Sequence, residues 1–275
     1  METCAAAAGW GCLVARVVLA VAVLAMPLAS HAAEADGPRI TRALKDAKLV
    51  SAAGVARPAR TNEQLAEGST LLTGPDSRVE IALSVRAVAR IGGKSAVKSV
   101  ANGRSLELQE GAVLFQAAKG GGAPKITTAN IHIATAGSTG VIERYGPAYV
   151  KILVLEGTAR VYLQKLGESV LVNAGQMLIT KPGAASLPEP VHFEIAKLYK
   201  TSLLTNADFA PLASHARIEA AIREQQSDPN FTPTNLVIYG RGTLVNLVAP
   251  TPTPAAAKSA GGAAKEPARP ATRNN

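Results

Sequence analysis

The stretch Arg78-Val79-Glu80-Ile81-Ala82-Leu83-Ser84-Val85 alternates apolar residues with small or polar ones. A period of two places the apolar side chains on one face of an extended chain, which is typical of a half-buried β-strand. The turn-forming run Gly74-Pro75-Asp76-Ser77 precedes it. The alternation returns in short segments at 106–109, 112–117, 131–133, 150–163, 170–172 and 177–179. Residues 65–181 are therefore predicted to form an all-β domain, built as a sandwich of short strands or as a β-solenoid.

Four glycines lie where one apolar run ends and another begins. Three of them follow a glutamate, at Glu67-Gly68, Glu110-Gly111 and Glu156-Gly157, and Gly175 follows Asn173-Ala174. Glycine adopts positive φ at little steric cost, so a strand can bend or bulge there without losing its ladder. Gly68, Gly111, Gly157 and Gly175 are therefore predicted to be structural corners between strands.

The first residues have the composition of a secretory signal peptide. Arg16 precedes an apolar run of 13 residues, 17–29, and the small residues Ser30 and Ala32 stand at the −3 and −1 positions of a cut after Ala32. We expect residues 1–32 to be removed, leaving a periplasmic or secreted chain with no spanning helix. Retention of the segment as an anchor is the alternative, although a spanning helix needs about 18–20 apolar residues.

Composition excludes several functions for such an exported chain. Both cysteines, Cys4 and Cys12, lie in the signal segment, so disulfides, thiolate nucleophiles and cysteine metal sites are not expected. Five Tyr and four Phe are few for base stacking, and nucleic acid is not an expected partner. Outside the cytoplasm, the net charge of +9 indicates anionic envelope polymers or simple solubility.

The remaining segments have less regular patterns. Residues 33–64 form an N-terminal segment that could be a short helix or a strand leading into the domain. Residues 182–248 are predicted to be an extension with helical spacing at 191–199 and 214–226, followed by two short strands around a Gly-Arg-Gly turn at 235–245. Residues 249–275 are rich in Pro, Ala, Gly and Lys and are predicted to be a disordered basic tail.

The sequence contains no convincing motif for catalysis or cofactor binding. Gly92-Gly93-Lys94-Ser95 lacks the earlier glycine of a phosphate loop, and Gly137-Ser138-Thr139-Gly140 lacks the spacing of a nucleophile elbow. The histidines that could serve a serine site or a metal are isolated, at His132, His192 and His215. We therefore predict no catalytic residue, no cofactor and no metal, with a serine hydrolase as the least favoured alternative.

An ordered series of short motifs resembles the extracytoplasmic FecR domain over residues 65–180. The series consists of Leu71-Leu72-Thr73-Gly74-Pro75-Asp76-Ser77-Arg78-Val79-Glu80, Ala89-Arg90-Ile91-Gly92, Leu106-Glu107-Leu108-Gln109-Glu110-Gly111, Ile126-Thr127-Thr128, Leu155-Glu156-Gly157 and Ala174-Gly175-Gln176. The best-known members are anti-sigma regulators with a cytoplasmic domain, one membrane helix and a periplasmic β domain. That β domain binds the signalling domain of an outer-membrane transporter. Only about 16 residues precede the apolar run here, so the resemblance implies a FecR domain without the cytoplasmic anti-sigma part.

The expected function is therefore that of an exported, non-enzymatic FecR-type domain that acts as a protein-interaction or signal-receiving module in the cell envelope. The resemblance implies an envelope protein as partner, such as the signalling domain of an outer-membrane transporter. An anionic envelope polymer is the other candidate partner, and a structural or polymer-binding envelope protein is the alternative function. If the partner binds by strand addition, the expected edges are Ile131–Ile133 and the strand from Tyr149.

Overall fold

The computed structural model describes residues 37–100, 105–120, 125–135, 137–164, 167–205 and 208–233. The predicted signal peptide 1–32, the predicted strands within 235–245 and the predicted tail 249–275 lie outside this part of the chain. No helix in the described ranges has the length and apolar character needed to cross a bilayer. The described elements are β1 (Arg39–Leu44), β2 (Ala47–Val50), β3 (Ala56–Pro58), β4 (Thr70–Thr73), β5 (Arg78–Ser84), β6 (Ala87–Ile91), β7 (Ala96–Val100), β8 (Ser105–Ala117), β9 (Lys125–Thr128), β10 (Ile131–Thr135), β11 (Ser138–Tyr145), β12 (Tyr149–Glu156), β13 (Thr158–Leu163), β14 (Ser169–Asn173), β15 (Gln176–Thr180), β16 (Val191–His192), α2 (Ile195–Thr201) and α3 (His215–Ser227).

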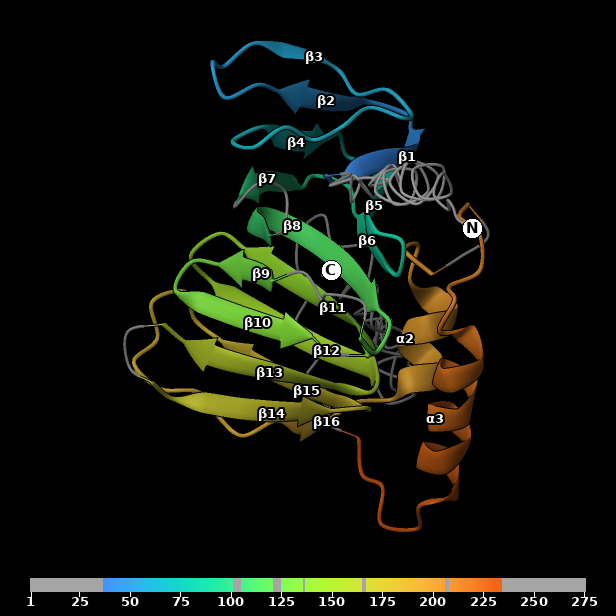
Figure 1. Cartoon of the computed structure of the whole chain (residues 1–275). Coiled ribbons are helices and arrows are strands. Elements are labelled where there is room, and N and C mark those ends of the chain that lie inside the picture. Colours follow the sequence, from blue (N-terminus) through green and yellow to red (C-terminus); the bar gives the residue numbers. More distant parts are fainter. Residues whose placement is uncertain are drawn as a thin grey trace, which may run out of the picture. The chain divides into compact units, whose positions relative to one another are not determined.

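The strands form two sheets that share β8 (Figure 1). Sheet A has the order β1-β5-β6-β8-β11-β12-β15-β16, and sheet B has the order β3-β2-β4-β7-β8-β9-β10-β13-β14. Every pairing is antiparallel except that of β8 with β9. Apolar residues from both sheets, such as Ile81, Phe115, Ile133 and Val161, form one buried cluster. The predicted all-β core is confirmed, and it has two facing sheets.

Strand β8 passes from one sheet to the other at Gly111. Residues before it pair with β7 in sheet B, and residues after it pair with β6 and β11 in sheet A. The φ of Gly111 is +92°, and a Cβ atom here would collide with Ser95. A side chain is therefore disfavoured both by the backbone conformation and by the neighbouring strand.

Gly157 has the same role between β12 in sheet A and β13 in sheet B. Its φ is +74°, and a Cβ atom would lie 2.5 Å from the carbonyl oxygen of Gly137. Gly68 and Gly175 also have positive φ, at +76° and +75°. Gly175 lies between β14 in sheet B and β15 in sheet A. The chain thus changes sheet at several of its glycines.

The β fold begins before residue 65. Strand β1 pairs with β5 in sheet A, and β2 pairs with β4 in sheet B. Ile40 and Leu49 are buried in the cluster between the sheets. The boundary between an N-terminal segment at 33–64 and a β domain at 65–181 therefore does not describe the sheets, and in the described part of this segment, residues 37–64, the alternative left open is resolved as strands.

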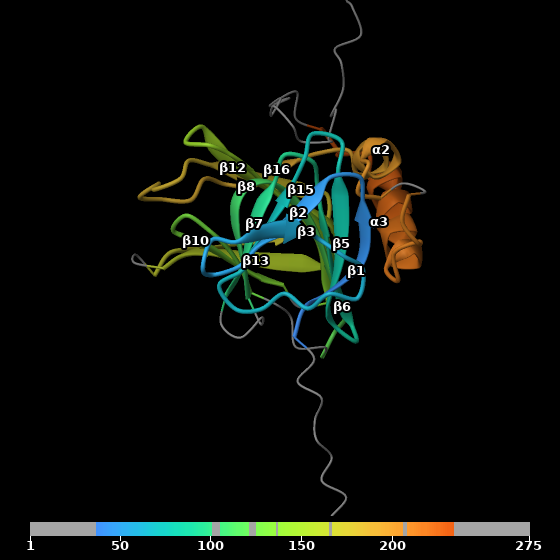
Figure 2. The ribbon, with the colours of Figure 1, turned by 90° about the horizontal axis from the view of Figure 1, so that it is seen from above.

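The region after residue 182 contributes a helical layer on the outer face of sheet A. The two helices run along one side of the strands (Figure 1, Figure 2). Their buried residues Leu198 and Ile218 pack with sheet-A residues such as Leu114 and Leu153. The helical spacing at 191–199 is only partly realised, because Val191 pairs with Met177 as β16 and the helix begins at Ile195. Helix α3 follows Ser214, as the sequence predicts.

The corner at Gly157 generates a stability prediction with a matched control. Gly120 has φ +72°, and no atom lies within 4 Å of the position that a Cβ would take, so Gly120→Ala tests positive-φ strain alone. That substitution should lower the free energy of unfolding by about 1 kcal/mol. Gly157→Ala adds the collision with Gly137 and should cost about 2–4 kcal/mol in total. Chemical denaturation of both variants measures the difference, and equal losses would contradict the role of Gly157 as a crowded corner.

Candidate functional site

The Arg90 side chain links the connection between α2 and α3 to sheet A through hydrogen bonds. Its side chain is 2% exposed, and its Nε donates to Glu80 Oε2 at 2.8 Å. Nη1 donates to the carbonyl of Leu204 at 2.9 Å and Nη2 to that of Ala210 at 2.5 Å. The guanidinium lies 4.7 Å from the centre of the Phe209 ring. Burial lowers the pKa of Arg90, and the bond to Glu80 opposes that change by favouring the cation.

A second polar contact fixes the start of α3 over the corner at Gly157. The Glu156 carboxylate is 4% exposed and accepts hydrogen bonds from Thr139 Oγ1 at 2.7 Å and from Arg217 Nε at 3.1 Å. The bond to Glu156 raises the pKa of Arg217. Ser214 stands at the N-cap position, but its Oγ lies 2.8 Å from Thr139 Oγ1 and makes no capping bond to the helix. The serine therefore joins the helix to the sheet.

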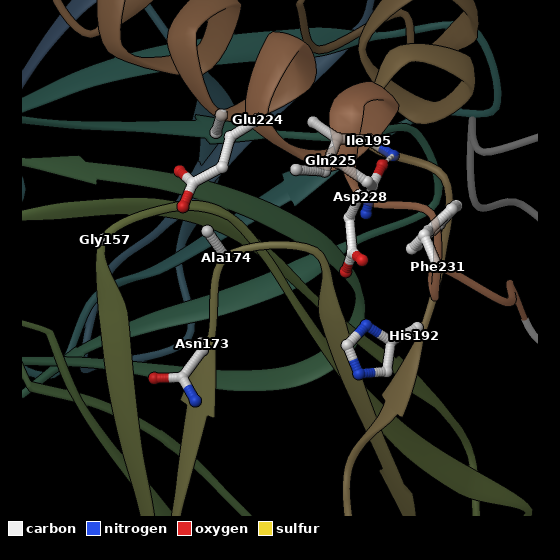
Figure 3. A pocket seen from close by; sticks show the side chains of 10 residues that line it. Gly157, Asn173, Ala174, His192, Ile195, Glu224, Gln225, Asp228 and Phe231 are labelled. Atoms are coloured by element: carbon white, nitrogen blue, oxygen red, sulfur yellow. Dashed lines mark hydrogen bonds between the residues drawn. The ribbon is translucent and has the colours of Figure 1, made fainter.

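A groove of about 340 Å³ lies between the C-terminal part of α3 and the nearby strand ends (Figure 3). Gln225 forms part of its wall: its Oε1 accepts the Ile195 N–H at 2.9 Å, and its Nε2 donates to the Phe193 carbonyl at 2.9 Å. In Figure 3 the Asp228 carboxylate points toward the His192 ring. The lining residues are Gly157, Asn173, Ala174, His192, Ile195, Ala221, Glu224, Gln225, Asp228 and Phe231.

The histidines and the serine considered for catalysis lie on separate elements. His132 bonds to Gln164 at 2.9 Å, His215 bonds to Tyr199 at 2.8 Å, and His192 makes an edge contact with Phe231. Ser138 is buried at the start of β11 and is bonded to none of them among the described contacts. The described residues also contain no group of three His, Asp or Glu side chains that could hold a metal ion. Within the described residues, Ser138 is therefore not paired with any of the three histidines as a nucleophile with its base.

Glu143 is a buried carboxylate whose partner is Lys151, the residue opposite it on β12. Burial raises the pKa of Glu143, and the Lys151 ammonium opposes that change. The two side chains are 0% and 1% exposed, so they belong to the covered face of sheet A. The pair is a structural ion pair within the sheet and is closed to a substrate.

Strand β14 is an open edge of sheet B. Within the described residues it pairs with β13 alone. It has five residues and no charged side chain, and Leu171 is 43% exposed. Such an edge can accept an additional strand, because its outward N–H and C=O groups are not used by the sheet.

The ladder indicates which backbone groups of β14 face outward. Leu163 N donates to the Glu168 carbonyl at 3.0 Å, so Glu168 points toward β13. Because hydrogen-bonded and non-hydrogen-bonded positions alternate in an antiparallel pair, Ser169, Leu171 and Asn173 point to the open side. The Asn173 N–H donates to Gln176 Oε1 at 3.0 Å, away from β13, which agrees with this assignment. Ser169 and Leu171 make no backbone bond to another described segment on that side.

The other edges are less suited to an added strand. β1 carries Arg39 and Arg42, β3 has three residues that include Arg57 and Pro58, and β16 has two residues. Charges, proline and short length each hinder edge pairing. Among the edges of the described sheets, β14 is therefore the best candidate partner site.

The edges expected from the sequence, Ile131–Ile133 and the strand from Tyr149, are wrong. β10 lies between β9 and β13, and β12 lies between β11 and β15. Alternation reports which face of a strand is buried, and it carries no information on whether a second neighbour is present. β14 shows the same kind of short apolar signal as these strands, so the sequence offered no means of selecting it.

Comparison with known proteins finds a family match for the central part of the β sheets. Residues 69–160 match the model of the family described as FecR protein, which confirms the resemblance seen in the sequence. The matched residues run from just before β4 into β13.

Two crystal structures, each of a candidate anti-sigma factor from Parabacteroides distasonis ATCC 8503, are similar in part. Their sequence identities are 13% and 12%, and both TM-scores are 0.41. The similarity covers 62% and 65% of this chain and 82% and 85% of those chains. A comparison with curated proteins gives no match.

The Arg90 contacts generate a prediction for the helical layer that forms the groove. Arg90→Met leaves the Leu204 and Ala210 carbonyls without their donor, so the free energy of unfolding should fall by about 2–4 kcal/mol. Hydrogen exchange in residues 203–205 and 208–213 should accelerate. Arg86→Met, at an exposed arginine on the neighbouring turn, should change stability by less than about 0.5 kcal/mol. Unchanged exchange in Arg90→Met would show that this arginine does not hold the connection.

Proposed function

We propose that this protein is an exported, non-enzymatic FecR-type module that binds a partner protein in the cell envelope and receives a signal from it. The FecR match over residues 69–160 supports the class, because that family is generally non-enzymatic and acts through protein partners. The signal-like composition of residues 1–32 supports export. An envelope protein, such as the signalling domain of an outer-membrane transporter, is the partner that fits this class.

The open edge of β14 is the observation that carries the proposal. An extended segment of the partner would pair with the outward backbone groups of Ser169 and Leu171 and extend sheet B. The Leu171 side chain and its cross-strand neighbour Arg160 would contribute specificity on the outer face. A segment continuing past Asn173 would meet the groove, since Asn173 and Ala174 line it (Figure 3).

Binding of an anionic envelope polymer is a second candidate, favoured by the outer face of sheet B. The rings of His132 and Tyr162 stack there with their centroids 5.2 Å apart. Lys125 and Arg160 are exposed on the same face, because both lie opposite Ala134 on neighbouring strands. An aromatic pair beside two cations suits an acidic polysaccharide.

A proline at Leu171 tests strand addition. Leu171→Pro removes an outward N–H but no hydrogen bond to β13, so the domain should stay folded while an added strand loses its central donor. Partner proteins crosslinked to the unsubstituted chain in envelope fractions should be lost from Leu171→Pro. Leu171→Ala retains the N–H and should keep most of the crosslinked product.

Melting temperatures of both variants control for folding. If a folded Leu171→Pro captures the same proteins as the unsubstituted chain, strand addition at β14 is excluded. Acidic polysaccharide that binds the chain and is released by Arg160→Ala, with no protein captured, would favour the polymer-binding function instead.

A further inference from the structure

We propose that β14 also pairs with β14 of a second copy of this chain, in an antiparallel arrangement centred on Leu171. This inference rests on the proposed function, because it concerns the same edge. It adds a way in which partner binding at that edge could be regulated. One edge cannot pair with two strands at once. Self-association and partner binding would therefore exclude each other, and the free edge would be protected until a partner arrives.

The absence of charge along β14 is the first argument. In a two-fold symmetric pairing, a residue meets the same surface of the other copy, so like charges near the axis face each other and repel. β14 contains Ser169, Val170, Leu171, Val172 and Asn173, with no charged side chain. Self-pairing of β1 or β3 would bring arginines together, and Pro58 removes a donor from β3. Of the described edges with more than two residues, β14 is the one that can face its own copy without repulsion between charged side chains.

The direction of the backbone groups is the second argument. A two-fold axis at Leu171 makes the two Leu171 residues a hydrogen-bonded pair that exchange N–H and C=O groups. Ser169 then lies opposite Asn173 of the second copy. The Asn173 N–H is already bonded to Gln176, but its carbonyl can accept from the Ser169 N–H. In this register the two Leu171 residues can therefore exchange both of their bonds, and each Ser169 N–H can donate to the Asn173 carbonyl of the other copy.

The side chains next to the axis suit the same register. Leu171 is 43% exposed, and the two leucines would cover each other on the outer face of sheet B. Arg160 Nη1 donates to Ser169 Oγ at 3.2 Å, which holds its guanidinium within its own copy. Glu168, just before β14, accepts the Leu187 N–H at 2.8 Å and would lie opposite the uncharged Ala174. No charge in β14 or directly before it opposes the pairing.

Single cysteines test the register in the full-length chain carrying Cys4→Ser and Cys12→Ser. Leu171→Cys places the two thiols opposite each other across the axis, within the Cα separation that a disulfide spans. Mild oxidation should give a covalent dimer on a non-reducing gel. Asn173→Cys places each thiol opposite Ser169 of the second copy, so it should crosslink far less. Equal crosslinking of the two variants, or none from Leu171→Cys, would overturn the proposal.

Sedimentation of the unsubstituted chain gives an independent measurement. A monomer–dimer equilibrium should be present and should shift to monomer in Leu171→Pro, whereas Ala56→Pro on the β3 edge should leave it unchanged. A chain that stays monomeric at every concentration refutes self-pairing. Loss of partner capture in Leu171→Pro would then still support the proposed function. A dimer that is lost in Leu171→Pro while partner capture persists supports self-pairing and refutes partner binding at β14.

Discussion

The fold depends on corners where the chain crosses between two sheets within one or two residues. At Gly111 and Gly157 the backbone takes positive φ while neighbouring strands lie too close for a side chain. These tight crossings let consecutive strands contribute to opposite sheets, so that their apolar faces meet in one cluster. The crossing at Gly157 also leaves Glu156 on the outer side of sheet A. There its carboxylate accepts hydrogen bonds from Thr139 and Arg217.

The outer faces of the two sheets differ in how they are covered, because the helical layer lies on sheet A alone among the described residues. The outer face of sheet A carries Leu114 and Leu153 together with the buried charge of Arg90, and it is covered by α2, α3 and their connection. The outer face of sheet B has no such cover among the described residues, and its last strand ends in an open edge. The helical layer thus buries one face, and the other carries the open edge that we propose as the binding site. The groove lies where the two regions meet, beside Asn173 and beneath α3.

The local sequence pattern predicted many of the strands. The side-chain partners and the neighbours of each strand depend on long-range pairing. The alternation of residues 78–85 and the positive φ at the glycine corners can be interpreted from the chain because they depend on local sequence, whereas the crowding of Gly111 by Ser95 and of Gly157 by Gly137 depends on the fold. The partners of Arg90 could not be predicted, since the two carbonyls lie 114 and 120 residues away in sequence. The same holds for β14: whether a strand has one neighbour or two depends on the topology. At Val191, pairing with Met177 replaced a helical spacing by a strand, so tertiary contact overrode the local preference.

Measurements at different ionic strengths can distinguish the two kinds of binding that we propose for this surface. Pairing along β14 rests on backbone hydrogen bonds and on Leu171, with no charged side chain in the strand, so added salt should leave it largely intact. Attraction of an acidic polymer to Lys125 and Arg160 acts between exposed charges, which physiological salt screens over about 8 Å. The two mechanisms share one face of sheet B but differ in their physical basis. A partner that stays bound as the salt concentration rises is therefore bound through the β14 edge. A partner that dissociates at higher salt is bound through Lys125 and Arg160.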